Sequence, residues 1–147
     1  MSKAFRFNLQ KVLDVRTQLE DQAKQALAKA QQALHLQRER LRALHEALSA
    51  HLEAVSGAQS MTSAEIWLWN NYKTGLDDDL AQGRALEARL AQDVQTRRLE
   101  LVDRARDRKL LDKLKETQAK RHETEANRKE QAEFDEMATL RFRREAF

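Results

Sequence analysis

Proline and cysteine are absent from this sequence of 147 residues, and glycine occurs only three times. A globular domain of this length needs several tight turns, which usually contain glycine and proline, so a fold with many turns is excluded. The absence of cysteine excludes disulfides, thiolate zinc sites and cysteine nucleophiles. Valine and isoleucine are also scarce, which excludes a β-sandwich, a barrel or a doubly wound α/β domain.

Long apolar runs are missing as well. The residues after Met1 lack the apolar core of a secretory signal, and no stretch of 18 apolar residues is available to cross a bilayer. We therefore expect a soluble chain, and the lack of cysteine is compatible with a reducing cytosol.

The residues that are abundant favour helices. Ala, Glu, Lys, Leu and Arg make up about 57% of the chain, a composition typical of long helices and coiled coils. The 27 basic and 24 acidic residues are interleaved, and the net charge is only +3. The composition therefore predicts an all-α protein whose surface carries charges of both signs.

The spacing of apolar residues predicts an antiparallel two-helix coiled coil, a single long α-hairpin spanning 1–147. Apolar residues recur at intervals of three and four from about residue 7 to 56 and again from about 62 to 141. Between them, Ser and Gly cluster at 57–61, where we place the turn. Thr62 and Glu65 have the spacing of a capping box, which predicts the start of a second, longer helix.

A turn centred near Gln59 would place residue i opposite about residue 118 minus i, because the two helices advance equally from the turn. Leu9 would then face Lys109, and everything beyond about Lys115 would overhang the first helix. The overhang has few apolar residues, which indicates a solvated helix, a disordered segment or a strip that docks on another protein.

The chain offers no obvious catalytic or metal site. His45 and His51 are six residues apart and lie on different helical faces, and the consecutive carboxylates of 77–79 point in different directions. A thin hairpin has no evident concave pocket, so we expect neither an enzyme, nor a cofactor, nor a small-molecule substrate. The basic stretch 97–121 has a local charge of +5 but interleaved anions and no aromatic residue, which argues against nucleic acid.

Two apolar groups are candidates for contact with other proteins. Trp67 and Trp69 are about 200° apart around the second helix, so both cannot be buried, and one of them or the pair Trp69 and Tyr72 should present an aromatic edge near the turn. The alternative is that these rings only cap the tip of the hairpin. Near the other end, Phe134 and Met137 share one helix face beyond the hairpin, which indicates a docking motif or a contact for self-association.

Three short stretches give the sequence a resemblance to the flagellar export protein family FliJ. They are Phe7-x-Leu9-Gln10-x-Val12-Leu13-x-x-Arg16, Trp69-x-x-Tyr72, and Lys129 followed by Phe134-Asp135-Glu136-Met137-Ala138. The resemblance implies an antiparallel coiled coil, similar to the central stalk of rotary ATPases, that acts at the flagellar type III export apparatus.

The same resemblance implies the partners. The protein would bind the export ATPase and promote its ring assembly, contact the cytoplasmic side of the membrane export gate, and handle export chaperones. It would be cytoplasmic, monomeric and peripherally associated with the inner membrane at the flagellar base. Positions aligned with the gate-contacting surface of the family lie near the tip, at Leu48, Leu52, Trp69, Tyr72 and Leu76.

Two other functions compete with this hypothesis. A homo-oligomeric structural coiled coil or helical adaptor unrelated to an ATPase would share the composition, but it would form a defined dimer or tetramer. A basic nucleic-acid-binding helix would lose affinity steeply with salt. Phe134 and Met137 would contact a partner protein if the chain is an export stalk, and a second copy of the chain if it is a homo-oligomeric coiled coil.

Overall fold

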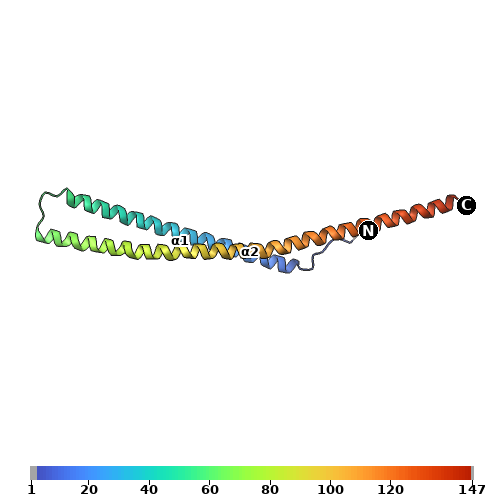
Figure 1. The fold of residues 1–147 in the computed structure, drawn as a ribbon, viewed down its shortest axis with the longest axis horizontal. Helices are drawn as coiled ribbons and strands as arrows, with labels where there is room; N and C mark the ends of the chain where they lie inside the picture. The colour runs from blue at the N-terminus through green and yellow to red at the C-terminus, as the bar shows by residue number, and fades with distance from the viewer. Residues whose placement is uncertain (1–2, 147) are drawn as a thin grey trace. The chain divides into compact units, whose positions relative to one another are not determined.

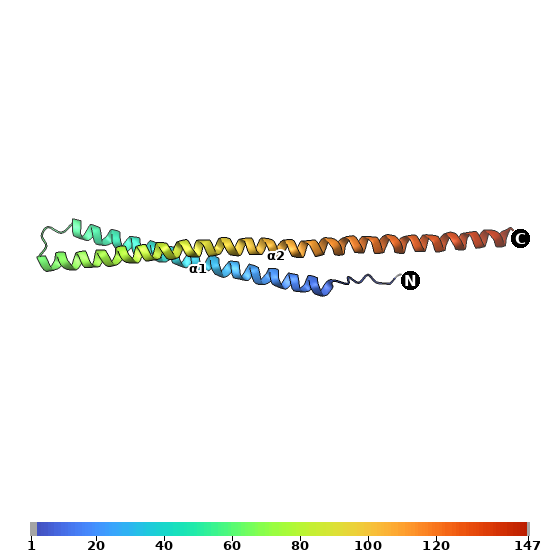
Figure 2. The same cartoon turned by 60° about the horizontal axis from the view of Figure 1, so that its bottom comes forward.

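The computed structural model describes residues 3–146 and contains two helices (Figures 1 and 2). Helix α1 spans Gln10–Ser56 and has 47 residues, and helix α2 spans Ser63–Glu145 and has 83 residues. Within residues 3–146 there is no strand. The predicted fold is therefore confirmed: the chain is all-α, folds back once as a hairpin, and has the longer helix second.

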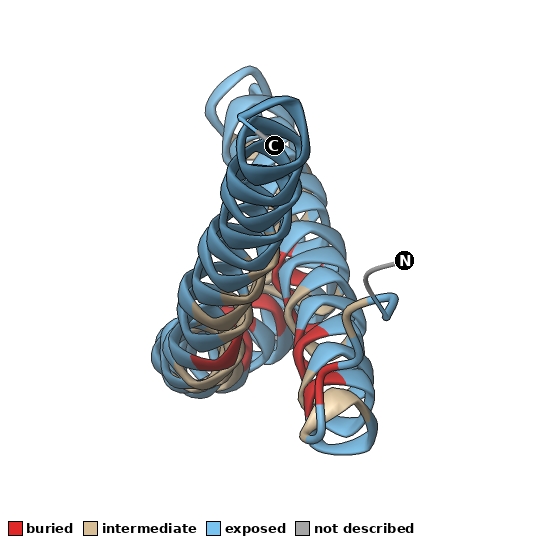
Figure 3. Ribbon diagram, turned by 90° about the vertical axis from the view of Figure 1, so that its right-hand side faces the viewer, coloured by how far each residue is buried: buried red, intermediate tan, exposed pale blue. Residues whose placement is uncertain are grey.

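The packing divides the hairpin into two units. One unit is formed by residues 21–102, which include the turn, and the other combines the described residues up to Glu20 with those from Asp103 onward. In the first unit Ala30, Leu34 and Val94 form a buried apolar cluster, and in the second unit Phe7, Leu13 and Leu111 form another. The buried positions appear in Figure 3 as short red segments on helices whose other residues are intermediate (tan) or exposed (pale blue).

The capping box predicted at the end of the turn is present in the structure. The Thr62 amide donates to the Glu65 carboxylate at 3.3 Å, and the Glu65 amide donates to the Thr62 hydroxyl at 3.2 Å. This reciprocal pair is the capping box, which satisfies backbone amides that have no partner inside the helix. At the end of α1, the Gly57 amide donates to the Glu53 carbonyl at 3.0 Å. The capping box thus fixes the start of α2 next to the turn.

The register of the two helices differs from the predicted one. In the second unit the Lys115 ammonium donates to the Gln10 side chain at 2.7 Å, so Lys115 and not Lys109 lies near the start of α1. The residue numbers of this pair sum to 125, and those of the pairs Arg16–Asp107 and Glu20–Arg108 sum to 123 and 128, so in this unit residue i lies opposite about residue 125 minus i in place of 118 minus i. The prediction assumed a symmetric turn, whereas polar contacts and apolar clusters between the helices determine which residues meet. Pairing also continues past Lys115, because the Phe5 ring lies 5.7 Å from the His122 ring.

The start of the first helix is also later than expected. Helix α1 begins at Gln10 and not near residue 7, because Phe7 packs into the apolar cluster as part of an irregular segment. Counting in steps of three and four from Leu9 would place Val12 in the interface, but Val12 is 42% exposed, and the neighbouring Leu13 is buried in its place. A shift of one residue rotates a side chain by about 100° around a helix, so this change moves Val12 off the interface.

Helix α2 continues well beyond the residues that pack on α1. The side chains after His122 are exposed up to residue 146, apart from the half-buried Ala126. The helix ends at Glu145, four residues later than the expected Arg141. Of the three predicted alternatives for this segment, the structure shows a helix with an exposed surface.

The two glycines inside α2 give a matched test of the packing. A Cβ at Gly75 would meet nothing within 4 Å, whereas a Cβ at Gly83 would lie 2.6 Å from Leu41 Cδ2 and 3.3 Å from Gln37 Nε2. Both Leu41 and Gln37 are buried, and Gln37 also donates to the Gly83 carbonyl at 3.0 Å. Small size is therefore required at Gly83 but not at Gly75.

We predict that Gly75→Ala raises the free energy of unfolding by about 1 kcal/mol, because alanine favours a helix over glycine. Gly83→Ala should lower it by about 1 kcal/mol, since crowding against Leu41 outweighs the same gain in helix propensity. Urea denaturation followed by far-ultraviolet circular dichroism measures both changes. Equal stabilisation by the two substitutions would contradict the close approach at Gly83.

Candidate partner-binding surfaces

Three rings from the two helices meet close to the turn. The His51 ring of α1 stacks on Trp69 of α2 with ring centres 5.4 Å apart and meets the edge of Tyr72 with centres 4.5 Å apart. His51 Nε2 also lies 3.3 Å from the Trp69 carbonyl oxygen. Aromatic pairs at these distances attract one another beyond the area they bury. The three rings therefore hold the two helices together at this end of the hairpin.

Around these rings lies an open apolar groove of about 530 Å³. Its lining includes His51, Val55, Met61, Leu68, Trp69 and Tyr72. We call this groove, together with the neighbouring Leu48 and Leu52, the tip surface. Trp67 is 63% exposed and Trp69 is half-buried, so the prediction that both could not be core residues is confirmed.

The five residues predicted at the tip have different environments. Tyr72 and Leu52 are exposed, and Leu48 and Trp69 are partly buried. Leu76 is only 7% exposed, because it belongs to the buried core between the helices. Tyr72, Leu52 and the edge of Trp69 are thus the members of the set that a partner could reach.

Sequence reasoning missed the role of His51, which it treated as a polar residue at the flank of a helix. A signal was available, because His51 follows Leu48 by three residues and precedes Val55 by four, which is the spacing of the interface. The Trp69 indole nitrogen is buried and has no hydrogen-bond partner. A buried donor without a partner costs free energy, so the indole N–H offsets part of the stability that the stacking of Trp69 on His51 provides.

The second candidate surface is the C-terminal patch, which consists of Phe134, Met137, Leu140 and Phe142. All four side chains are more than half exposed, and Phe134 is 66% exposed. One open depression is lined by Met137 and Leu140 together with the three basic residues Arg141, Arg143 and Arg144. The structure thus places Phe134 and Met137 together on the uncovered part of α2, as the sequence predicted. The patch also includes the apolar residues Leu140 and Phe142 and is bordered by arginines.

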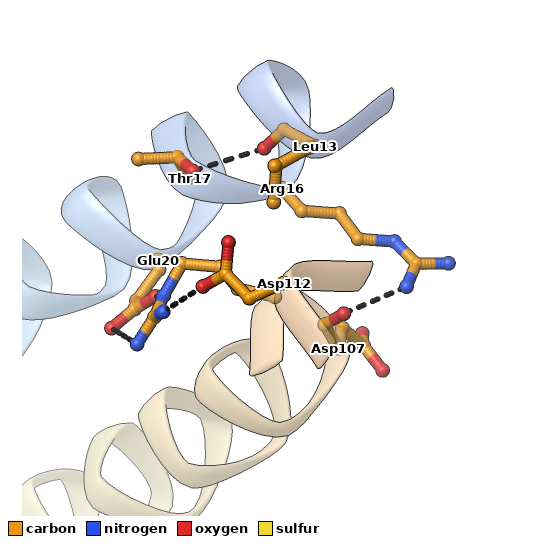
Figure 4. A network of polar contacts seen from close by, with 7 residues as sticks. Leu13, Arg16, Thr17, Glu20, Asp107 and Asp112 are labelled. Atoms are coloured by element: carbon orange, nitrogen blue, oxygen red, sulfur yellow. Dashed lines mark hydrogen bonds and ion pairs between the residues drawn. The ribbon is translucent and has the colours of Figure 1, made fainter. Parts of the chain in front are cut away.

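A network of charged side chains joins the helices in the unit that includes Glu20 and Asp103 (Figure 4). The guanidinium of Arg108 on α2 donates to the carboxylate of Glu20 on α1, which is buried, and to Asp112. One turn earlier on α1, Arg16 donates to the backbone carbonyl of Asp107 at 2.7 Å. Because a buried carboxylate needs a partner, the network favours the alignment that brings Glu20 to Arg108.

The network also fixes the charge of its arginine. The hydrogen bond that Arg108 donates to the Glu20 carboxylate, with a second one to Asp112, raises the pKa of Arg108 above its ordinary value. The charged form is therefore favoured further over the neutral form. Across the physiological pH range Arg108 remains a cation, so this contact holds the helices in register without acting as a proton switch.

The part of the chain that the structure describes contains neither a cluster of metal ligands nor a segment that could span a membrane. Within residues 3–146, no group of three or more His, Asp or Glu side chains is placed to hold a metal ion. Neither α1 nor α2 contains a segment apolar enough to span a bilayer.

Comparison with known proteins identifies a family. A family model described as the flagellar FliJ protein matches residues 5–147, which is nearly the whole chain. No curated protein and no solved structure shows a significant match. The matched range includes both helices, the tip surface and the C-terminal patch.

The ring contacts at the tip predict that the two tryptophans differ in their effect on stability. Trp69→Ala should lower the free energy of unfolding by about 1–2 kcal/mol, because it removes a half-buried ring that stacks on His51. Trp67→Ala should change it by less than about 0.5 kcal/mol, since that ring is mostly exposed. Urea denaturation measures both values, and equal losses would argue against the placement of Trp69.

Proposed function

The chain belongs to the flagellar FliJ family, which makes it a component of the flagellar export apparatus, and we propose that it acts there as a non-enzymatic stalk and adaptor. In this proposal the hairpin binds the export ATPase and promotes assembly of its ring. It also contacts the cytoplasmic side of the membrane export gate and binds export chaperones. It works as a monomer in the cytoplasm, associated peripherally with the inner membrane at the flagellar base.

The observation that carries the proposal is the family match over residues 5–147. The geometry supports it in one respect. A hairpin of two helices leaves apolar side chains uncovered at the tip surface and at the C-terminal patch, and such side chains are common anchors in protein interfaces. An adaptor needs separate surfaces of this kind, because it has to bind more than one partner.

We assign the ATPase contact to the C-terminal patch. Phe134 and Met137 lie on a part of α2 that packs on no other described segment, so a partner can surround this helix without displacing α1. The ATPase ring would then gain affinity from burying Phe134 and Met137. A stalk inside the ring would present a different face to each ATPase subunit. A face that binds the closed conformation of a subunit more tightly than the open one shifts that subunit toward closure, because a ligand shifts an equilibrium only by its differential affinity.

We assign the gate contact to the tip surface. Tyr72 is exposed and lines the groove, and Leu52 is an exposed side chain next to His51 in the sequence, whereas Leu76 is buried and Leu48 is half-buried. A partner that covers the groove would bury Tyr72 and the edge of Trp69, and one that extends over the whole tip surface would bury Leu52 as well. Aromatic residues of this kind contribute a large share of binding free energy in protein interfaces.

The ATPase contact predicts the effect of a double substitution. Phe134→Ser with Met137→Ser should weaken binding to the export ATPase by about tenfold or more, because two exposed apolar anchors are lost. Titrating the chain into the ATPase and measuring ATP hydrolysis gives the concentration for half-maximal stimulation.

The control for this experiment is Leu99→Ser with Val102→Ser, a pair with the same spacing on α2 and similar exposure. It should leave the half-maximal concentration unchanged. An unchanged value for the Phe134 and Met137 variant would reject the assignment of the patch. No stimulation by the unsubstituted chain at saturation would reject the stalk function itself.

The gate contact predicts a different pattern. Leu52→Ala with Tyr72→Ala should weaken binding to the cytoplasmic domain of the gate protein by about tenfold, while stimulation of the ATPase is retained. Leu36→Ala, a substitution of an exposed leucine elsewhere on α1, serves as the control. Isothermal titration calorimetry measures the affinities, and equal losses in the tip variant and the control would contradict the assignment.

A further inference from the structure

A third apolar surface lies on the unit that includes Glu20 and Asp103, away from the tip surface and the C-terminal patch. It consists of Val12, Val15 and Leu19 on α1 and of Leu110 and Leu114 on α2. Leu110 is 66% exposed, Val15 is 53% exposed, and Leu19 is partly buried. We call these five residues the lateral face. Neither the ATPase contact nor the gate contact proposed above uses it.

The helix interface shows where these side chains point. In this unit, α1 meets α2 through Leu13, Arg16 and Glu20, and α2 meets α1 through Leu111 and Lys115 (Figure 4 shows the three from α1). Each lateral-face residue comes directly before one of these interface residues in the sequence. One step along a helix rotates the side chain by about 100°, so the apolar residues form a row beside the interface on each helix.

The two rows lie on the same side of the helix pair. Because α2 runs opposite to α1, a rotation of the same sense moves its side chains to the same side of the plane that separates the helices. The register brings Val15 opposite Leu110 and places Val12 near Leu114. The rows therefore adjoin along the line where the two helices meet, and they border the buried cluster that contains Leu13 and Leu111.

The charges beside the lateral face are mostly positive. Lys11 is the helical neighbour of Val15 one turn back, and Arg106 and Lys113 are the neighbours of Leu110 on either side; all three are exposed. The one carboxylate among these neighbours is Asp107, whose backbone carbonyl accepts a hydrogen bond from Arg16. On α1 and just before it, the row continues at the same helical spacing from Asn8 through Val12, Val15 and Leu19 to Gln22, and none of these five residues is charged.

We propose that the lateral face binds an amphipathic helix of another protein, and that this helix carries carboxylates beside its apolar row. The line between two packed helices is a groove that a third helix can fill with side chains at every third or fourth position. Carboxylates on the incoming helix would pair with Lys11, Arg106 and Lys113, whereas a basic helix would be repelled. The hairpin thereby becomes a three-helix bundle at this position. This inference does not depend on the proposed roles at the ATPase and the gate.

The test uses two synthetic helical peptides of about 21 residues and the full chain. Both peptides carry leucines at coiled-coil spacing; one has glutamates beside the leucines and the other has lysines. Fluorescence anisotropy at physiological salt should show saturable binding of the acidic peptide, about tenfold or more tighter than the basic one. Equal affinity for the two peptides would overturn the proposal.

Substitutions locate the binding surface. Val15→Ser with Leu110→Ser should weaken binding of the acidic peptide by about tenfold, whereas Leu36→Ser with Leu99→Ser, two similarly exposed leucines in residues 21–102, should not. Lys11→Gln, Arg106→Gln and Lys113→Gln together should remove the preference between the peptides while leaving residual binding. Far-ultraviolet circular dichroism of each variant verifies that helix content is retained.

Three outcomes would overturn the proposal after the variants are made. The first is a loss of binding in the control variant as large as that in the lateral-face variant. The second is a dimer, measured by analytical ultracentrifugation, that Val15→Ser with Leu110→Ser dissociates, because the face would then bind a second copy of the chain. The third is binding to vesicles with 30% anionic phospholipid without binding to the acidic peptide, which would assign the face to a lipid surface.

Discussion

Two helices can cover only one side of each other, and this constraint shapes the whole protein. Burial is confined to small clusters, such as Phe7, Leu13 and Leu111, and to single residues between them. The remaining apolar side chains stay at the surface, because there is no third layer to cover them. In a larger bundle Tyr72, Leu110 and Phe134 could all be core residues; here they are available to other proteins.

With so little apolar interface, polar contacts decide how the helices align. Gln37 donates to the carbonyl of Gly83 in one unit, and the buried carboxylate of Glu20 meets Arg108 in the other. An apolar interface tolerates sliding by a heptad at modest cost, whereas a buried carboxylate or amide that loses its partner is expensive.

The sequence was sufficient for features that depend on neighbouring residues, and insufficient for those that depend on pairing between helices. The capping box of Thr62 and Glu65, the turn at 57–61 and the two helices follow from local spacing. The register was wrong because nothing local determines it. The spacing after Leu48 places His51 at the interface, but it could not indicate that the partner ring across the interface is Trp69, because that depends on the register.

The candidate surfaces share no residue, and this separation matters for an adaptor. The tip surface lies in residues 21–102, while the C-terminal patch and the lateral face occupy different parts of α2 in the other unit. A partner that covers Phe134 and Met137 leaves Tyr72 and Leu110 uncovered, so direct competition for the same side chains is avoided. All three surfaces are already formed on the folded hairpin, so the binding of a partner at one surface is not required to order the side chains of the others. Any coupling between partners would therefore have to act through the register of the helices, which the contacts of Glu20 and Gln37 oppose changing.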